Sequence, residues 1–118
     1  MEKDIIRMFS DTEGETHFED SKIQLTDVDG FFRWTEHIKA TGFYIAELFS
    51  SEFNDWHVVP RRQYLVPLEG KAEFGVSDGS KRVIGPGTIL LAEDTTGKGH
   101  TRQLLNNAKQ TVLLITLD

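Results

Sequence analysis

The chain has 118 residues, of which 38% are hydrophobic and 27% charged, and these values suit one globular domain rather than a disordered segment. It contains no cysteine, which excludes a disulfide framework, a cysteine-ligated zinc site and a thiol nucleophile. The net charge of −6 argues against nucleic-acid binding, because an acidic protein repels phosphate backbones.

The first forty residues carry only weak strand signals. His17-Phe18 and residues 22–25 are candidate short strands. An apolar patch, residues 31–34, follows the turn Asp29-Gly30, and we expect it either to cover the body of the protein or to contact a second subunit.

Strand signals dominate from residue 43 onward. Short β-branched and aromatic runs are separated by the turn sequences Glu69-Gly70, Asp78-Gly79 and Gly85-Pro86-Gly87. Many short strands at this spacing are typical of a sandwich or barrel. The predicted strands are 43–49, 63–66, 72–76, 82–84, 88–91 and 111–117, and we predict no helix.

No segment has the features of a membrane span or a leader. The longest apolar stretch, Val112 to Ile115, has only the length of a strand, and the N-terminus begins with mixed charges. We therefore expect a cytoplasmic protein with no membrane partner.

Two segments carry polar residues at informative spacings. In the first, His57 and Gln63 precede Gly70 by thirteen and seven residues. In the second, Gly87 is followed by His100, with Glu93 and Asp94 between them. If residues 57–63 formed one unbroken strand, His57 and Gln63 would lie on the same face.

These segments resemble the two motifs of the cupin family, G-x5-H-x-H-x3or4-E-x6-G and G-x5-P-x-G-x2-H-x3-N. His57 matches the first histidine of the first motif, Gln63 stands where the family has glutamate, and His100 matches the histidine of the second. The sequence departs from the family at four further positions, namely Ser51 for glycine, Val59 for histidine, Glu93 for proline and Leu104 for asparagine.

The resemblance implies an all-β fold, a cupin or jelly-roll-type antiparallel β-barrel. It implies one domain over residues 1–118, with 1–42 as N-terminal strands and cover and 43–117 as the conserved barrel. It also implies a homodimer. Metal-binding cupins hold one divalent ion with three histidines and a glutamate, so the implied metal ligands here are His57, Gln63 and His100.

The implied cofactor is one divalent metal, such as Zn, Fe, Mn or Ni, in a weak or atypical site, since a neutral amide replaces a carboxylate. Glu93 or Asp94 could restore that charge. The alternative is that both histidines are hydrogen-bonded inward-facing residues with no metal. Tyr64 and Trp56 are interpreted either as packing residues or, with Arg61 and Glu93, as part of a substrate pocket.

Two functions remain open. The first is an enzyme acting on a small polar molecule, with His57 and His100 as catalytic groups that bind metal or exchange protons. The second is a non-catalytic module in which the same groups only orient a small-molecule ligand. The fold itself does not choose between them.

Overall fold

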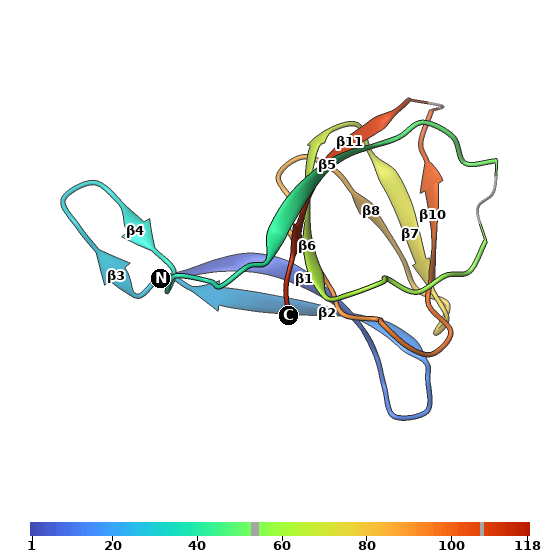
Figure 1. Ribbon diagram of the computed structural model, residues 1–118, viewed down its shortest axis with the longest axis horizontal. Helices are drawn as coiled ribbons and strands as arrows, with labels where there is room; N and C mark the ends of the chain where they lie inside the picture. The colour runs from blue at the N-terminus through green and yellow to red at the C-terminus, as the bar shows by residue number, and fades with distance from the viewer. Residues whose placement is uncertain (53–54, 107) are drawn as a thin grey trace.

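The protein is all-β, as the sequence predicts. The computed structural model describes residues 1–52, 55–106 and 108–118, and no helix occurs among them (Figure 1). Hence no described segment is a helix of the length and apolarity that crossing a membrane requires. The strands are β1 (Glu2–Ser10), β2 (Thr16–Gln24), β3 (Asp27–Val28), β4 (Arg33–Trp34), β5 (Gly42–Leu48), β6 (Gln63–Glu69), β7 (Ala72–Val76), β8 (Lys81–Ile84), β9 (Leu90–Ala92), β10 (His100–Leu104) and β11 (Gln110–Thr116).

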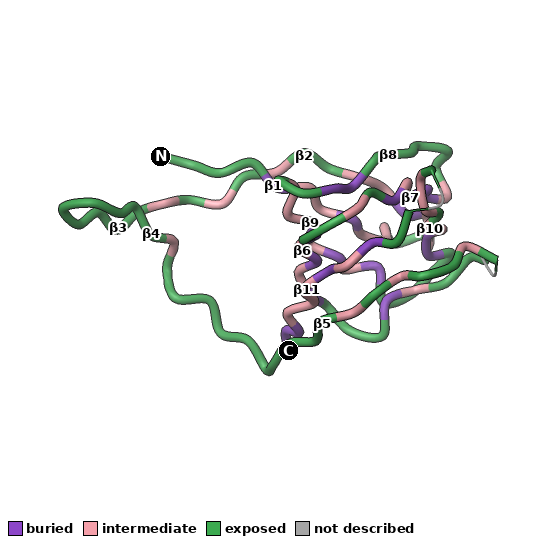
Figure 2. The backbone as a smooth tube through the Cα atoms, turned by 90° about the horizontal axis from the view of Figure 1, so that it is seen from above, coloured by how far each residue is buried: buried purple, intermediate pink, exposed green. Residues whose placement is uncertain are grey.

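Two sheets share one hydrophobic core. The larger has the strand order β2-β1-β9-β6-β11-β5, and the smaller has the order β10-β7-β8. The large sheet supplies Met8, Leu65, Leu90 and Val112 to the core, and the small sheet supplies residues such as Phe74. Figure 2 shows the buried stretches on strands of both sheets, in the half of the molecule away from the N-terminus.

The alternation of side chains along the strands explains which residues face the core. In β6, Gln63, Leu65 and Pro67 are buried while the residues between them are partly exposed. A strand sends successive side chains to opposite faces, so Gln63 lies on the core side with Leu65. Its register supports this, because Gln63 pairs with buried Ala92 and buried Thr116.

The turn predicted at Asp78-Gly79 is confirmed. It joins β7 to β8 as an antiparallel hairpin, and Gly79 has a φ of 96°. This left-handed conformation strains residues with a side chain but not glycine, which is why glycine suits the turn.

The expectation of one antiparallel barrel over residues 43–117 needs correction. The described strands form separate sheets rather than one closed ladder. In addition, β1 lies between β2 and β9 and pairs with β9 in parallel, so the large sheet is mixed. The sequence pattern missed β1 because its alternation of apolar and charged residues is weak.

Residues 57–62 also differ from the expected continuous strand. β6 begins at Gln63, and before it only His57 makes an isolated bridge, to His100. His57 is exposed whereas Gln63 is buried, so the two do not share a face through strand alternation.

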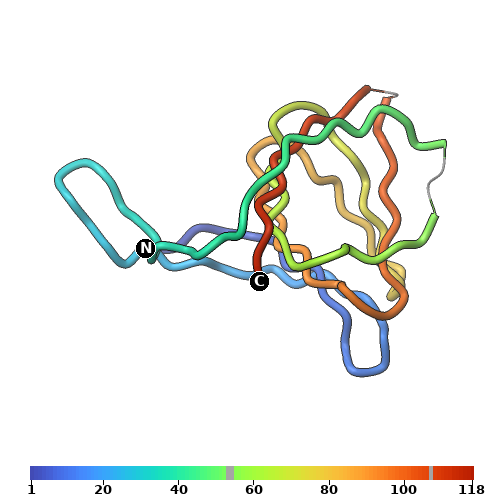
Figure 3. Tube along the Cα trace, viewed as in Figure 1, coloured from blue at the N-terminus to red at the C-terminus, as the bar shows by residue number. Residues whose placement is uncertain are grey.

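The hairpin β3–β4 projects from the body as an arm (Figure 3). It explains why the radius of gyration is 14.8 Å, compared with about 13.5 Å for a compact chain of this length. The N-terminus lies at the base of the same arm.

Candidate functional site

His57 and His100 are brought together by the backbone. The amide N–H of His57 donates to the carbonyl of His100 over 3.1 Å, and the amide of His100 donates to the carbonyl of His57 over 2.8 Å. A third bond, from the Val59 N–H to the Asp94 carbonyl at 3.2 Å, holds the same segment against the start of the 94–100 loop. The two segments, 43 residues apart in the sequence, therefore meet where β10 begins.

Gly99 permits this close approach. It has a φ of 76°, and a Cβ built there would lie 2.2 Å from the carbonyl oxygen of His57. A side chain at position 99 would thus strain the backbone and displace His57. A glycine immediately before His100 is consequently part of the site.

The two imidazole rings pack against each other, with centroids 4.4 Å apart and planes inclined by 56°. The Nδ1 of His57 lies 2.9 Å from the carbonyl oxygen of Asp55. A carbonyl oxygen only accepts hydrogen bonds, so this Nδ1 carries the proton. The Nε2 of neutral His57 is then left as an acceptor.

His100 is held in the same tautomer by a carboxylate. Its Nδ1 lies 2.6 Å from Oδ2 of Asp94, and both side chains are buried. An ionised carboxylate accepts, so Nδ1–H donates and Nε2 remains an acceptor in the neutral ring. The other oxygen of Asp94, Oδ1, is buried and has no hydrogen-bond partner among the described residues.

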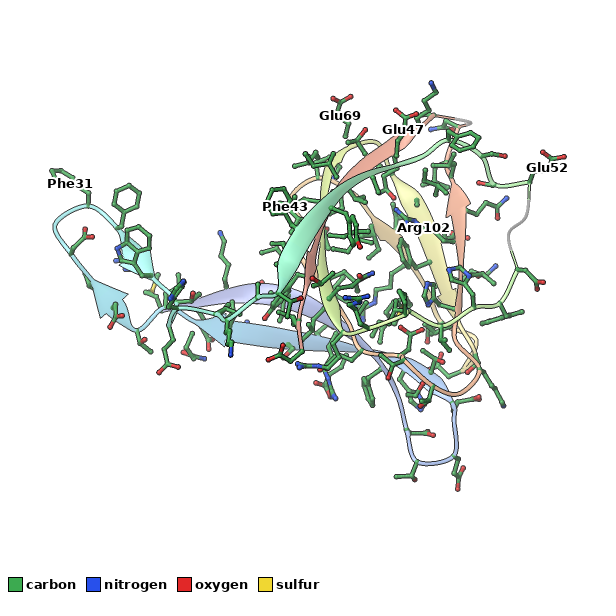
Figure 4. All side chains as sticks on the ribbon, in the orientation of Figure 1. Phe31, Phe43, Glu47, Glu52, Glu69 and Arg102 are labelled. Carbon is green, nitrogen blue, oxygen red and sulfur yellow. The ribbon has the colours of Figure 1, made fainter. Side chains whose placement is uncertain are left out.

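An aromatic ring and a guanidinium extend the site into the core. Phe74 of β7 lies nearly parallel to the His100 ring, at 5.7 Å between centroids. Arg102, two residues after His100 on β10, lies 5.2 Å from the centroid of the same phenyl ring and donates to Oε1 of Gln110 over 3.0 Å. Figure 4 labels Arg102 beside β10.

Burial lowers the pKa of Arg102 to about 10, because an apolar environment disfavours the charged form. We did not single out Arg102 from the sequence. The two-residue spacing from His100 was the available signal, since residues i and i+2 of a strand share a face.

Gln63 is buried on the core side of β6. Within the described ranges, no hydrogen bond joins the Gln63 side chain to His57 or His100. The structure therefore brings together two of the three predicted metal ligands and adds Asp94 behind one of them.

Two of the four residues of the predicted substrate pocket, Tyr64 and Glu93, make other contacts. Trp56 and Arg61 are exposed near the histidine pair in sequence. Tyr64 points to the outer face of the large sheet, where it lines an apolar hollow with Val66 and Ile115. Glu93 pairs with Arg7 at 2.5 Å and with Arg62 at 2.7 Å.

Of the two carboxylates considered in the second motif, Asp94 is therefore the one beside a histidine. Burial alone would raise the pKa of Glu93, but hydrogen bonds from Arg7 and Arg62 outweigh burial and lower it. Glu93 is thus held ionised as part of an ion-pair cluster away from the imidazoles.

The donor set does not make a complete metal site. No group of three His, Cys, Asp or Glu side chains among the described residues is placed to hold an ion. The carboxylate of Asp94 accepts a hydrogen bond from Nδ1 of His100, so it supports that imidazole rather than acting as a third metal ligand beside it. A metal at this place would have two imidazoles and would need Gln63 or solvent to complete its coordination.

No protein-family model matches this chain, and no match to a curated protein was found. A solved structure, that of protein NMB1881 from Neisseria meningitidis, is similar to it with a TM-score of 0.51 and 20% sequence identity. The similarity covers 80% of this chain and 92% of that chain. At this identity, the likeness concerns the fold alone.

Proposed function

We propose that this chain is a cupin-type protein that binds a small polar organic molecule at the His57–His100 pair. The observation that carries the proposal is the pair itself. Two imidazoles lie 4.4 Å apart, and each has its Nδ1 engaged by an acceptor of the protein. Each neutral ring then keeps Nε2 for a ligand that donates a hydrogen bond, such as a hydroxyl or an ammonium group.

Asp94 fixes the tautomer and the orientation of His100. Its buried carboxylate accepts from Nδ1–H and leaves Nε2 as the acceptor of the neutral ring. If binding is followed by a reaction, His100 is the group we assign as general base, with His57 beside it to orient the substrate. Gln63, from the core side, supplies a neutral amide that can satisfy a further polar group of the ligand.

Binding can be tested by recording histidine side-chain nitrogen resonances while adding small sugars, amino alcohols and hydroxy acids. A ligand of this site shifts the Nε2 resonances of His57 and His100 and leaves those of His17 and His37 unchanged. His100→Ala should weaken binding at least tenfold, which corresponds to about 1.4 kcal/mol. A ligand that binds His100→Ala as tightly as wild type would contradict the assignment.

The second candidate is a divalent metal site, and a specific observation favours it. A carboxylate bonded to the distal nitrogen of a histidine is the usual support of a metal-ligating imidazole. We expect calorimetric titration with Zn, Ni, Mn and Fe(II) to show weak binding that either His57→Ala or His100→Ala abolishes. Gln63→Glu should strengthen it by adding a charge, and His17→Ala is the matched control.

If none of these metals binds and Gln63→Glu gains nothing, the metal candidate is rejected. The metal-free binding module then stands as the function of this site. Two imidazoles without a third charged ligand are sufficient to orient a small molecule, whereas a complete metal centre needs more protein ligands.

A further inference from the structure

Along strands β5, β11 and β6, the six-stranded sheet is apolar on both of its faces. On the side opposite the core, β11 carries Leu113 and Ile115, which register with Ile45 and Phe43 of β5 and with Val66 and Tyr64 of β6. A water-exposed face of an antiparallel sheet normally carries polar residues at alternate positions. The apolar residues on this outer face are therefore typical of a sheet surface that packs against another structural element.

None of the residues that the structure describes covers the β5 part of this outer face. Phe43 is 66% exposed and Ile45 is 68% exposed. Beside them lies an apolar hollow lined by Phe43, Leu113, Ile115 and residues 40–42. Exposed apolar area of this kind on one face marks an interaction surface.

The arm carries the complementary surface. Phe31 is 97% exposed, Phe32 60% and Trp34 52%. Figure 4 shows Phe31 at the tip of the arm, far from the body, and Phe43 on the side of β5 that faces the arm.

The aromatic cluster of the arm, Phe31, Phe32 and Trp34, is preorganised by contacts within the arm. The carboxylate of Asp29 accepts hydrogen bonds from the amides of Phe31 and Phe32 and from Nε1 of Trp34. The rings of Phe32 and Trp34 pack with centroids 5.2 Å apart. A preorganised aromatic cluster loses little conformational entropy when it docks, which favours binding.

We propose that two copies of this chain exchange arms, each placing the β3–β4 aromatic cluster on the outer face of the other copy's six-stranded sheet. A second copy is the natural occupant because one chain holds both halves of the interface. A twofold axis then satisfies both arms at once. This proposal does not depend on the ligand of the histidine pair.

The exposed area is sufficient for such a dimer. Each large aromatic residue buries 150–250 Å², so the exposed parts of the three arm aromatics provide about 300–500 Å² per arm. Two arms and two receiving faces then bury about 1,200–2,000 Å² in total, the range of stable protein interfaces. The chain therefore has enough surface for a dimer in the micromolar range or tighter.

Sedimentation velocity at tens of micromolar protein tests the proposal with four proteins. Wild type should be a dimer, and the arm variant Phe31→Ser/Phe32→Ser and the face variant Phe43→Ser/Ile45→Ser should each be monomers. The matched control, Val83→Ser, removes an exposed apolar residue from β8 of the small sheet and should remain a dimer. Circular dichroism confirms that each variant is folded.

A second measurement does not depend on those substitutions. In a Trp56→Phe background, Trp34 is the remaining tryptophan, and its emission should shift to the red on dilution as the arm leaves the partner. A monomeric wild type, a dimer that survives either double substitution, or emission that does not change with dilution would each overturn arm exchange.

Discussion

At the scale of single residues, the site depends on tautomers that the surroundings impose. Asp94 and the carbonyl of Asp55 accept from the Nδ1 atoms of His100 and His57, respectively. The proton on each neutral ring is thereby placed on Nδ1, which is the less common tautomer of a free imidazole. The contact of Asp94 is made by its buried side chain, so a substitution at position 94 can remove it. The contact of Asp55 is made by its backbone carbonyl, which a substitution would leave in place.

We expect Asp94→Asn to release the tautomer of His100. The amide can either donate or accept, so it no longer requires a proton on Nδ1. Nitrogen NMR of the imidazole should show Nδ1–H for both histidines in wild type and mixed tautomers for His100 in the variant. His57, whose acceptor is a backbone carbonyl, is the internal control and should not change.

Gly99→Ala should separate the two histidines. Both Gly99 and Gly79 have positive φ, so alanine at either position costs about 1–2 kcal/mol in backbone strain. Only at Gly99 does the new Cβ meet the His57 carbonyl, whereas nothing lies within 4 Å of a Cβ at Gly79. We expect urea unfolding to show a further loss of about 1–3 kcal/mol for Gly99→Ala, with Gly79→Ala as the control.

At the scale of elements, an ion-pair cluster joins the two hairpins. His17 of β2 lies between two carboxylates, with Nε2 at 2.7 Å from Asp11 and Nδ1 at 2.8 Å from Asp78. Asp11 belongs to the β1–β2 turn and Asp78 to the β7–β8 turn. His17 therefore connects the end of the large sheet to the small sheet.

This cluster predicts a pH-dependent stability. The hydrogen bond that His17 donates to Asp11, and then the one that it donates to Asp78, raises the pKa of His17 above its usual 6.5. The stabilisation is therefore complete below pH about 6.5 and is lost as the pH rises through the raised pKa. The urea midpoint of wild type should exceed that of His17→Gln clearly at about pH 5.5 and much less at about pH 8.5.

His37→Gln provides the control for this experiment. A difference between wild type and His17→Gln that stays constant or grows towards alkaline pH would show that His17 acts by packing rather than by charge. At the acid end, the same stabilisation should decline as Asp11 is protonated, since its pKa is lowered by the hydrogen bond with His17.

At the scale of the whole molecule, the N-terminal strands complete the fold. β9 has only three residues and lies between β1 and β6. Met8 of β1 is fully buried in the core, and Ile5, on the opposite face of the strand, is 7% exposed beside Tyr64. The arm, by contrast, contributes no residue to the core cluster.

We therefore expect a chain reduced to residues 43–117 not to unfold cooperatively. Loss of the buried side chains of Ile5 and Met8 alone removes about 3–6 kcal/mol, a large part of the 5–15 kcal/mol that stabilises a typical domain. Replacing residues 27–34 by a short Gly-Ser linker should leave urea unfolding at low protein concentration nearly unchanged. A cooperative transition in the 43–117 chain would refute this view of β1.

Local patterns were sufficient for the fold class and for much of the strand content. Alternating apolar residues predict β6 and β7, and Asp78-Gly79 predicts their hairpin neighbour β8, because strand period and turn conformation are properties of a few adjacent residues. Spacing to Gly70 and Gly87 also directed attention to His57 and His100. Each of these signals lies within about fifteen residues of chain.

The tertiary structure decided what depends on residues far apart. The parallel pairing of β1 with β9, the contact of Asp94 with His100 and the outward position of Tyr64 follow from how the sheets assemble. A period of two assigns residues to two faces of a strand, but it does not say which face meets the core or which segment lies opposite. Packing makes that choice, since the observed arrangement buries Met8, Phe74 and Leu90 in one core.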